Sequence, residues 1–359
     1  MRPSASSALR VAHFPPQAPE NPYIQLLCDA LRERGVSIVT PPGRPSILWL
    51  LRMHRSVDVL HFHWPEVHYQ RRSRLLTLLK LGHFAAFLLT AVGLGCTVVW
   101  TAHNVEPHES TVLLDRWVLR FMVRVASIVA HCQWAADEVR RRWGARGEIL
   151  VVPHGHYIGR YPDRVSREEA RRRLGLPMDA RVFLHFGALR EYKGVENLLT
   201  AFQKLGGDHL RLLIAGQLRD AALGERICKA ARQDSRIVFY PGFVAEESVQ
   251  LYFRAADMVV LSYARVTTSG SLILALSFGR GVIAPSMGCL PEIIDTSTGI
   301  LYNPMDEDGL LEALRRSLGM DRSVAGMKAR EAAERLSWNG VAEQHAAFYR
   351  KICGTRVER

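Results

Sequence analysis

The sequence has no pair of cysteines at CxxC spacing and no cluster of histidine with cysteine. Its six cysteines are scattered along 359 residues, which argues against a disulfide framework and against a structural zinc site. The N-terminal stretch, MRPSASSALRVAHFPP, lacks an apolar run long enough for a secretory signal. We therefore expect a protein that stays inside the cell, in a reducing compartment.

Acidic residues are scarce relative to basic ones: 35 Asp and Glu stand against 47 Lys and Arg, for a formal net charge of +12. This excess favours an acidic partner, such as nucleic acid, anionic lipid or a phosphorylated substrate. The basic residues lack the interleaved aromatic motif of a nucleic-acid reader, so we expect no nucleic-acid partner.

The length and the pattern of apolar segments predict two α/β domains. An apolar fraction of 48% is typical of a packed globular protein. A chain of this length is long enough to form two domains of ordinary size. In each half, short apolar runs such as VDVLHFH and LRLLIAG alternate with helix-like segments, which indicates parallel sheets covered on both faces. We expect domains at 1–160 and 161–336, then a C-terminal helix, 337–359, that crosses back to the first domain.

The segment from Gly187 to Gly194, GALREYKG, leaves a predicted strand through a glycine and presents Arg190 and Lys193 before a helix. A glycine turn lets the backbone approach a ligand, and the two cations suit a diphosphate. The alternative is a solvated turn between a strand and a helix.

A second segment of the same domain reads RVTTSGSLILALSFGRG, from Arg265 to Gly281. Its hydroxyl residues and glycine stand at the start of an apolar helix, where free N–H groups and the helix dipole favour an anion. The residues in question are Thr268, Ser269, Gly270 and Ser271. Two anion sites in one domain suggest a bound nucleoside diphosphate.

The motifs of the second domain run in the order G-x-L-x-x-x-KG, IAG, a strand ending in GFV, and a helix followed by G-x-x-VIA. This order resembles the donor-binding domain of GT-B glycosyltransferases, above all those around the large retaining family 4. WTAHNVEPHE resembles the T-x-HN-x-x-PHE loop of bacterial members, and VVPHGHY resembles their V-I-P-N-G-V linker. The resemblance spans nearly the whole chain and implies two Rossmann-like domains whose parallel sheets face each other across a cleft.

The resemblance also implies roles for individual residues. Lys193 matches the family lysine on the donor diphosphate, and Arg190 substitutes for the arginine that relatives carry at the place of Ala188. The nucleobase and ribose are approached by residues that follow two strands of the donor domain: Gln217, Gly242, Phe243 and Val244. The implied substrate is a nucleoside diphosphate sugar, with no cofactor and no metal.

Two family glutamates are missing from this chain. The family pattern is E-x7-E, and Val266 and Leu274 stand at its places. The form Ser-Gly-Ser-x-x-Leu-Ala-Leu-Ser-Phe-Gly at 269–279 instead resembles that of bacterial exopolysaccharide transferases, including the β-mannosyltransferases of xanthan-type repeat assembly, which are inverting. We therefore expect inversion, with the anomeric outcome left open.

An inverting transfer needs a general base within hydrogen-bond reach of the acceptor hydroxyl. We expect it in the first domain, in the segments HNVEPHE and HFHWPE. The candidates are Glu106, Glu109, His103 and Glu66. A structural histidine at a strand end, or carboxylates that cap the following helices, are the alternatives.

The segment HFHWPEVH also invites a metal interpretation, since His61 and His63 share a strand face and His68 lies nearby. No Cys or Asp completes a ligand set, so we expect no metal site. An acceptor role for His63 and Trp64 is the better interpretation.

The segment from Tyr69 to Gly95 begins with basic residues and continues with leucine and phenylalanine. We predict a helix that lies in the headgroup region of an anionic membrane, on the inner face of the cell membrane. A buried core helix and a true membrane span are the alternatives. Its basic residues include Arg71, Arg72 and Arg74.

The leading hypothesis is a glycosyltransferase that moves a hexose, with mannose from GDP-mannose as the expected donor group, to a lipid-linked or oligosaccharide acceptor. Bacterial polysaccharide or glycolipid synthesis is the expected setting. Two alternatives remain open from the sequence: a non-catalytic scaffold that binds nucleotide sugars or membrane, and a sugar-nucleotide isomerase of the same shape.

Overall fold

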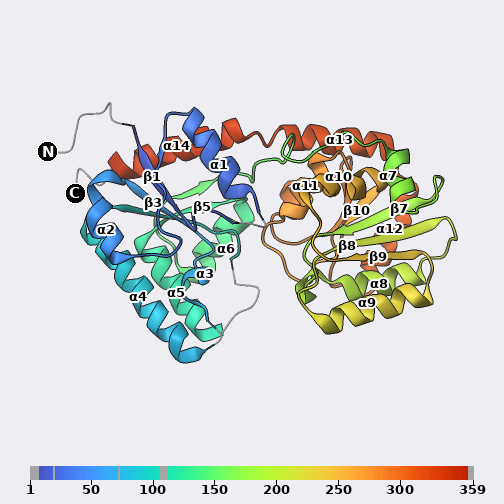
Figure 1. The fold of residues 1–359 in the computed structure, drawn as a ribbon, viewed down its shortest axis with the longest axis horizontal. Helices are drawn as coiled ribbons and strands as arrows, with labels where there is room; N and C mark the ends of the chain where they lie inside the picture. The colour runs from blue at the N-terminus through green and yellow to red at the C-terminus, as the bar shows by residue number, and fades with distance from the viewer. Residues whose placement is uncertain (1–7, 19–20, 72, 106–111, 355–359) are drawn as a thin grey trace. The chain divides into compact units, whose positions relative to one another are not determined.

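The computed structural model describes residues 8–18, 21–71, 73–105 and 112–354. The chain divides into two compact units (Figure 1). The first contains residues 1–155 and 337–359, and the second contains residues 156–336. Each unit is built around its own parallel sheet, which confirms the predicted α/β fold class.

The first sheet has the strand order β2-β1-β3-β4-β5-β6, with neighbours parallel. Its strands are β1 (Arg10–Phe14), β2 (Ser37–Ile38), β3 (Val59–His63), β4 (Thr97–Thr101), β5 (Ser127–Ala130) and β6 (Ile149–Val151). Because side chains alternate along a strand, one face carries the series Val11, Val59, Val99 and Val129 and the other carries Phe14 and Phe62.

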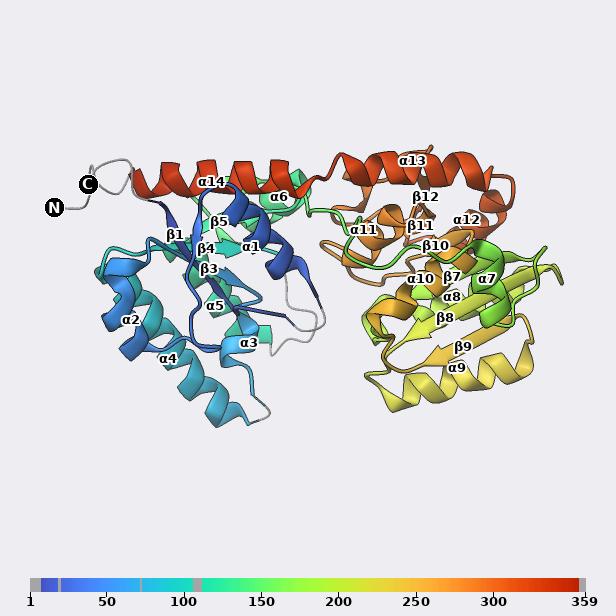
Figure 2. The same cartoon turned by 45° about the horizontal axis from the view of Figure 1, so that its top comes forward.

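Helices cover both faces of this sheet (Figures 1 and 2). The valine face packs against α1 (Tyr23–Glu33) and α14 (Trp338–Gly354), which contact each other. The opposite face is covered by α2 (Ile47–Met53), α4 (Arg74–Gly93) and α5 (Val112–Val125). Two further helices are α3 (Glu66–Tyr69) and α6 (Gln133–Trp143), and η1 (His54–Ser56) is a single 3-10 turn.

The second sheet has the order β12-β11-β10-β7-β8-β9, again parallel. Its strands are β7 (Arg181–Phe186), β8 (Leu210–Gly216), β9 (Ile237–Pro241), β10 (Met258–Val260), β11 (Gly281–Pro285) and β12 (Gly299–Tyr302). One face packs against α8 (Val195–Lys204), α9 (Ala221–Gln233) and α12 (Gly309–Leu318). The other helices are α7 (Arg167–Arg173), α10 (Glu246–Ala255), α11 (Gly270–Ser277) and α13 (Arg322–Glu334).

Both sheets reverse their strand order next to their first strand. In the first unit the chain runs from β1 outward to β2 and returns to β3 on the other side of β1; in the second it returns from β9 to β10, beside β7. Open parallel sheets bind ligands beyond the carboxyl ends of the strands at such switch points. The loops after β3, β4, β7 and β10 are therefore where sites are expected.

Candidate functional site

Three groups of the second unit converge at the carboxyl end of β7. Gly187 follows this strand with a φ of 115°, Lys193 ends η2 (Glu191–Lys193), and Ser271 lies in the first turn of α11. The Lys193 Nζ lies 3.5 Å from the Ser271 Oγ. A Cβ atom on Gly187 would lie 3.0 Å from this Nζ and 3.5 Å from this Oγ. Glycine therefore keeps open the space in front of the ammonium group.

Lys193 carries an isolated positive charge in this site. Its side chain is 8% exposed, and within the described residues its contacts are the Ser271 hydroxyl and the Tyr263 ring, not a carboxylate. Burial lowers the pKa of Lys193, and the nearby Arg190 charge contributes to that effect. Because a buried ammonium without a counterion is unfavourable, an anionic ligand would complete the site.

The start of α11 lies beside Lys193. Ser269 caps the helix: its hydroxyl accepts the Leu272 N–H at 3.0 Å and lies 2.8 Å from the Tyr263 hydroxyl. This hydroxyl is therefore used within the fold, while Thr268, Gly270 and Ser271 are partly exposed. The free N–H groups and dipole of the first turn add positive potential next to the ammonium.

The residues at the places of the family glutamates are both apolar in the folded unit. Leu274 is buried within α11, and Val266 lies in the loop before it. Neither position supplies a carboxylate beside Lys193 and Ser271.

The residues predicted to approach the nucleobase and ribose lie at the same edge of the sheet. The Gln217 carbonyl accepts the Leu189 N–H at 2.8 Å, and the Gly242 N–H donates to the Gly216 carbonyl at 3.0 Å. A Cβ atom on Gly216 would lie 1.8 Å from the Gly187 carbonyl oxygen, so β7 and β8 end in close contact. Beyond them, Val244 is partly exposed and the Phe243 side chain is 68% exposed.

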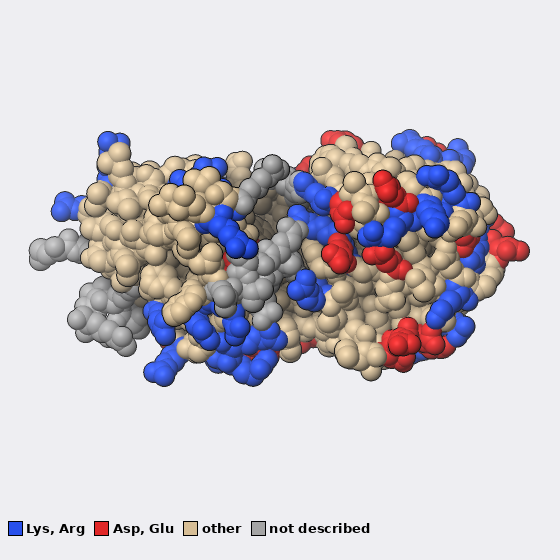
Figure 3. Space-filling model, turned by 90° about the horizontal axis from the view of Figure 1, so that it is seen from below, with Lys and Arg blue, Asp and Glu red and all other residues tan. Residues whose placement is uncertain are grey.

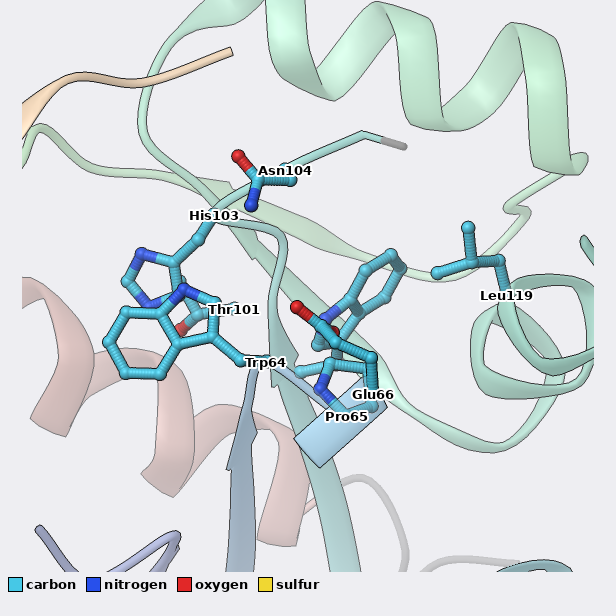
Figure 4. A pocket seen from close by; sticks show the side chains of 8 residues that line it. Trp64, Pro65, Glu66, Thr101, His103, Asn104 and Leu119 are labelled. Carbon is cyan, nitrogen blue, oxygen red and sulfur yellow. The ribbon is translucent and has the colours of Figure 1, made fainter. Parts of the chain in front are cut away.

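The first unit has a pocket at the carboxyl ends of β3 and β4 (Figure 4). Its lining consists of Trp64, Pro65, Glu66, Trp100, Thr101, His103, Asn104 and Leu119. The Trp64 indole lies flat against the His103 ring, with centroids 4.3 Å apart and planes at 15°. Trp64 has a φ of 46°, in the left-handed region that disfavours bulky residues.

Among the described residues that line this pocket, Glu66 carries the carboxylate. It begins α3 directly after Trp64 and Pro65, and its carboxyl group points into the space that the lining side chains surround. Burial raises the pKa of Glu66 to about 7, and the Asp115 charge adds to the rise. A carboxylate with a pKa close to 7 is suited to take up a proton at neutral pH.

Both ring nitrogens of His103 are hydrogen-bonded to other histidines. Its Nε2 lies 3.1 Å from the His63 Nδ1, and its Nδ1 lies 3.2 Å from the His131 Nε2. Burial lowers its pKa well below the ordinary range for histidine. The ring is therefore neutral and engaged on both sides, which favours Glu66 over His103 as the base.

Two further base candidates, Glu106 and Glu109, lie outside the described residues, as does Arg72. The described start of their loop is held by α6, since the Trp143 Nε1 donates to the Val105 carbonyl at 3.0 Å.

The histidines of β3 form a group with His13 of β1. One nitrogen from each of His13, His61 and His63 lies within 4.8 Å of the others, a set that could hold a metal ion. His13 joins the group because β1 pairs with β3 in a register that sets it opposite His61. The nitrogens of His61 already lie 2.6 Å from the Tyr349 hydroxyl and 2.6 Å from the Thr101 hydroxyl. A metal ion bound through either nitrogen of His61 would have to displace the hydrogen bond at that nitrogen.

His68 is not part of this group, contrary to the expectation that it lies near His61 and His63. It belongs to α3 and packs against Phe14, Phe62 and Phe84 on the other side of the sheet. The turn at Trp64 and Pro65 redirects the chain between the strand and the helix, so proximity in sequence does not bring the rings together.

Comparisons with known proteins decide the family. Residues 180–319 match the family model described as "Glycosyl transferases group 1". Over 350 residues the chain is 30% identical to the GDP-mannose:glycolipid 4-beta-D-mannosyltransferase of Xanthomonas campestris pv. campestris, covering 94% of this chain and 90% of that protein. The chain belongs to the group 1 family of GT-B glycosyltransferases. This confirms the family resemblance and makes the protein an enzyme, which sets aside the scaffold and the isomerase.

Other similar proteins agree with this family. A D-inositol 3-phosphate glycosyltransferase of Streptomyces bingchenggensis is 31% identical over 62% of this chain and 52% of its own length. Among solved structures, a sucrose-phosphate synthase of Thermosynechococcus elongatus has a TM-score of 0.73 at 19% identity, covering 97% of this chain and 100% of that one. HepE of Anabaena, in complex with UDP, has a TM-score of 0.71 at 15% identity, covering 96% and 100%. Both structures share the fold.

This glycosyltransferase exposes an apolar surface with basic residues on α2, α4 and α5. Its exposed apolar side chains are Leu48, Leu51, Leu75, Leu76, Leu78, Leu79, Leu89, Val92 and Trp117. Its exposed basic residues are Arg52, Arg74, Lys80, Arg116, Arg120 and Arg124. The one carboxylate in these helices, Asp115, is buried. Figure 3 shows Lys and Arg side chains gathered at the lower edge of the first unit.

The helix α4 is long and apolar enough to cross a membrane by length and composition, yet only 28% of its most apolar stretch is buried. It packs against β4, α2, α3 and α5 of the first unit. The low burial disagrees with the alternative of a core helix. Arg74 begins α4, while Arg71 precedes it and donates to the Val67 carbonyl.

Sequence reasoning named His63 but missed the other histidines of this group in the glycosyltransferase, namely His13, His131 and His154. A signal for them exists: the pattern Val-x-His recurs at Val11–His13, Val59–His61, Val129–His131 and Val152–His154. Period-two spacing at the end of successive parallel strands sets these rings on one face of the sheet. Asp115 was also missed, because nothing in the sequence of α5 indicates that it accepts a hydrogen bond from the Tyr69 hydroxyl at 2.6 Å.

Proposed function

We propose that this glycosyltransferase moves mannose from GDP-mannose to a lipid-linked or oligosaccharide acceptor in bacterial polysaccharide or glycolipid synthesis. The isolated ammonium of Lys193 carries the proposal, because a donor diphosphate supplies the anion that this buried charge lacks. The choice of sugar and acceptor follows the Xanthomonas relative, whose name specifies GDP-mannose and a glycolipid.

The leaving diphosphate is the group that the second unit stabilises. Lys193, Arg190 and the first turn of α11 supply positive potential where negative charge grows as the glycosidic bond to phosphate breaks. These groups do the work that a divalent cation does in other transferases, so we propose that transfer needs no metal ion. A chelator such as EDTA is then expected to leave the initial rate unchanged.

The transfer proceeds with inversion in this proposal. The carboxylates that retaining relatives carry are replaced by Val266 and Leu274, so the proton of the acceptor hydroxyl is taken up in the first unit. Glu66 is the proposed base, because its carboxyl group lines a pocket at the carboxyl ends of the strands and has a pKa of about 7. Attack by the acceptor oxygen then releases GDP from the opposite face of the sugar.

The acceptor is met at a membrane surface in this proposal. The exposed leucines of α4, with the basic residues of α2, α4 and α5, suit the headgroup region of an anionic bilayer. Attachment is peripheral, on the inner face of the cell membrane, where nucleotide sugars are available and a lipid-linked acceptor has its polar end.

The experiment that tests the function is a donor screen followed by a transfer assay. Thermal midpoints are measured with GDP-mannose, UDP-glucose and a dTDP-sugar, since a ligand that binds only the folded state raises the midpoint. We expect the largest shift with GDP-mannose, and mannose transfer to a lipid-linked oligosaccharide. No shift with any of the three would contradict the donor site itself.

The variant Lys193→Ala is expected to abolish the midpoint shift by GDP-mannose and to lower kcat/KM about 100-fold or more, as loss of a charge-assisted contact with a transferring group does. The matched control is Lys204→Ala, which removes an exposed lysine of the same unit that pairs with Asp308 at 3.1 Å. An unchanged shift in the Lys193 variant, with normal folding, would speak against the diphosphate role.

A further inference from the structure

The face of the first sheet covered by α1 and α14 carries a layer of buried histidines at the carboxyl ends of its strands. It consists of His13, His61, His63, His103, His131 and His154. Burial lowers the pKa of each ring, so all are neutral at physiological pH. In a neutral imidazole one nitrogen donates and the other accepts, so every hydrogen bond in the layer has a direction.

Four of these rings form a continuous hydrogen-bonded chain. The His131 Nε2 lies 3.2 Å from the His103 Nδ1, and the His103 Nε2 lies 3.1 Å from the His63 Nδ1. The His63 Nε2 in turn lies 3.0 Å from the His13 Nδ1. One end of the chain is anchored to the backbone, because the His131 Nδ1 lies 3.1 Å from the Val152 carbonyl oxygen.

The backbone anchor determines the tautomer of all four rings. A carbonyl oxygen only accepts, so His131 carries its proton on Nδ1 and accepts with Nε2. His103 must then donate from Nδ1, and the same requirement passes to His63 and to His13. The hydrogen-bonded chain of histidines ends at the His13 Nε2. This acceptor is buried and has no partner among the described residues of the protein.

The middle of this chain supports the pocket of the first unit. His103 is held at both nitrogens, and its ring stacks on Trp64, whose φ of 46° is unfavourable for a residue with a large side chain. Trp64 is followed by Pro65 and Glu66, which line the same pocket. A strained backbone at this position persists only where the surroundings hold it.

We propose that the histidine chain is a positioning device for the acceptor pocket: His63 and His131 lock the ring of His103, and His103 holds Trp64 in place next to Glu66. The inference rests on the proposed function where it treats the pocket as the acceptor site. The hydrogen-bonded chain of histidines and its tautomers do not depend on that function. His13, His63 and His131 are positioning residues here, and His103 supports the pocket wall instead of accepting the proton of the acceptor.

The structural part is tested by NMR on the full-length protein with ¹⁵N-labelled histidine. Long-range ring correlations report the tautomer of each imidazole, and single-histidine variants assign the signals. We expect the Nδ1–H form for His13, His63, His103 and His131. A protonated Nε2 at His63 or His103 overturns the chain, whether or not the protein transfers mannose.

Metal analysis of the purified protein is the second arm of this test. The hydrogen-bonded histidine chain predicts no stoichiometric transition metal, since an ion between His13 and His63 would replace their hydrogen bond. Bound zinc at one equivalent, lost in His13→Phe, overturns the proposal and assigns a metal site instead.

The functional part is tested with His63→Phe and His131→Phe, which keep an aromatic ring and remove the hydrogen bonds. We expect the acceptor KM to rise about tenfold or more, with the donor KM and the acidic limb of the pH profile unchanged. A loss of kcat together with the acidic limb in His103→Phe would identify His103 as the base and overturn the proposal.

The matched control is His185→Phe, which removes a buried histidine of the second unit whose Nδ1 lies 3.1 Å from the Val260 carbonyl oxygen. If His63→Phe and His131→Phe fold poorly, the tautomers of the unmodified protein still decide the structural part. If transfer fails for all variants and for the unmodified protein while the tautomers match, the proposed function is wrong. The predicted hydrogen-bonded chain of histidines is then still confirmed.

Discussion

Glu66 and Lys193 are the two residues whose charges have the clearest consequences. Lys193 is a buried cation in the second unit, and Glu66 is a carboxylate in the pocket of the first. Each owes its shifted pKa mainly to burial, which disfavours the charged form of either sign. A ligand with negative charge stabilises the ionised form of Lys193, whereas a pKa of about 7 leaves Glu66 able to accept a proton.

The Glu66→Gln variant is expected to lower kcat about 100- to 10,000-fold, the usual contribution of a general base. The base acts when ionised, so kcat/KM of the unmodified enzyme should fall about tenfold per pH unit below pH 7, and this fall should vanish in the variant. Steady-state kinetics from pH 5 to 9 measure both effects. The control is Glu33→Gln, an exposed carboxylate on α1. An unchanged acidic limb in the variant would contradict the role of Glu66 as the base.

Gly187→Ala tests the space in front of the Lys193 ammonium. A methyl group there would lie 3.0 Å from Nζ, in a backbone conformation with a φ of 115°. We expect a higher KM for the nucleotide sugar, together with lower stability. The Gly175→Ala control shares a positive φ of 61° but meets nothing within 4 Å, so it should lose stability and keep its donor KM. Equal donor KM values for both variants would argue against a ligand at this glycine.

At the scale of the element, α4 differs from the other helices in how much apolar surface it leaves uncovered. The helix begins at Arg74, and its buried residues include Thr77 and Phe84. Most of its leucine side chains are exposed to solvent. A helix that only completed a core would bury its apolar side chains. The observed arrangement leaves them available for a bilayer, while the packed side keeps α4 attached to the unit.

The double variant Leu75→Gln and Leu79→Gln is expected to weaken binding to anionic phosphatidylglycerol vesicles by about tenfold or more, since each buried leucine contributes about 1.5–3 kcal/mol. Vesicle sedimentation measures the effect, with zwitterionic vesicles giving weaker binding throughout. The control is Val324→Gln with Met327→Gln, which removes exposed apolar side chains from α13.

The same membranes also distinguish peripheral attachment from a membrane span. A peripheral protein is released by alkaline carbonate, and we expect release here. Retention in the washed membrane would indicate that α4 spans the membrane. Vesicle binding that changes neither with the leucine substitutions nor with the lipid charge would contradict a membrane role for this surface.

At the scale of the whole molecule, the two units differ in their buried histidines, most of which lie in the described part of the first unit. The pKa of His13 and His154 is lowered to about 3, and that of His131 and His345 to about 4. The unfolded chain binds protons at these residues with a pKa near 6.5, so it binds more protons than the native state below that pH. Stability from these rings is therefore complete above pH 6.5 and is lost as the pH falls toward 4.

We expect the first unit to unfold at a higher pH than the second, because each such histidine costs about 1.4 kcal/mol per pH unit below 6.5. The chain offers a direct measurement, since all seven tryptophans lie within residues 1–155 and 337–359. Tryptophan fluorescence thus reports the first unit, while far-ultraviolet circular dichroism reports both. Coincident transitions, or stability that stays flat between pH 7 and 5, would contradict this expectation.

Local patterns were enough to predict the fold class and to single out the segments that bring Gly187, Lys193 and Ser271 together. Apolar runs alternating with helix-like segments specify a parallel α/β sheet, because both faces of each strand must be covered. Gly187, Arg190 and Lys193 lie within one short segment, and Ser271 stands at a recognisable helix start. Their chemistry can be predicted from the sequence because each motif is complete within a few residues.

The histidine layer could not be predicted in the same way. Each strand contributes one or two rings, and the rings meet only because parallel registers align the ends of β1, β3, β4, β5 and β6. His68, only four residues after Trp64, packs against Phe62 on the opposite face of the sheet. His345, far along the sequence in α14, packs against His61.

The amino-acid sequence alone therefore specified the α/β class, the family resemblance and the segments that carry Lys193 and Ser271, because these depend on periodicity and on contiguous motifs. The tertiary structure was needed to show that His103 has both nitrogens engaged, that Glu66 lines a pocket and that the α4 leucines stay exposed. These properties depend on burial and on partners distant in sequence, and burial is set by how strands and helices pack, not by the residue types of any one segment.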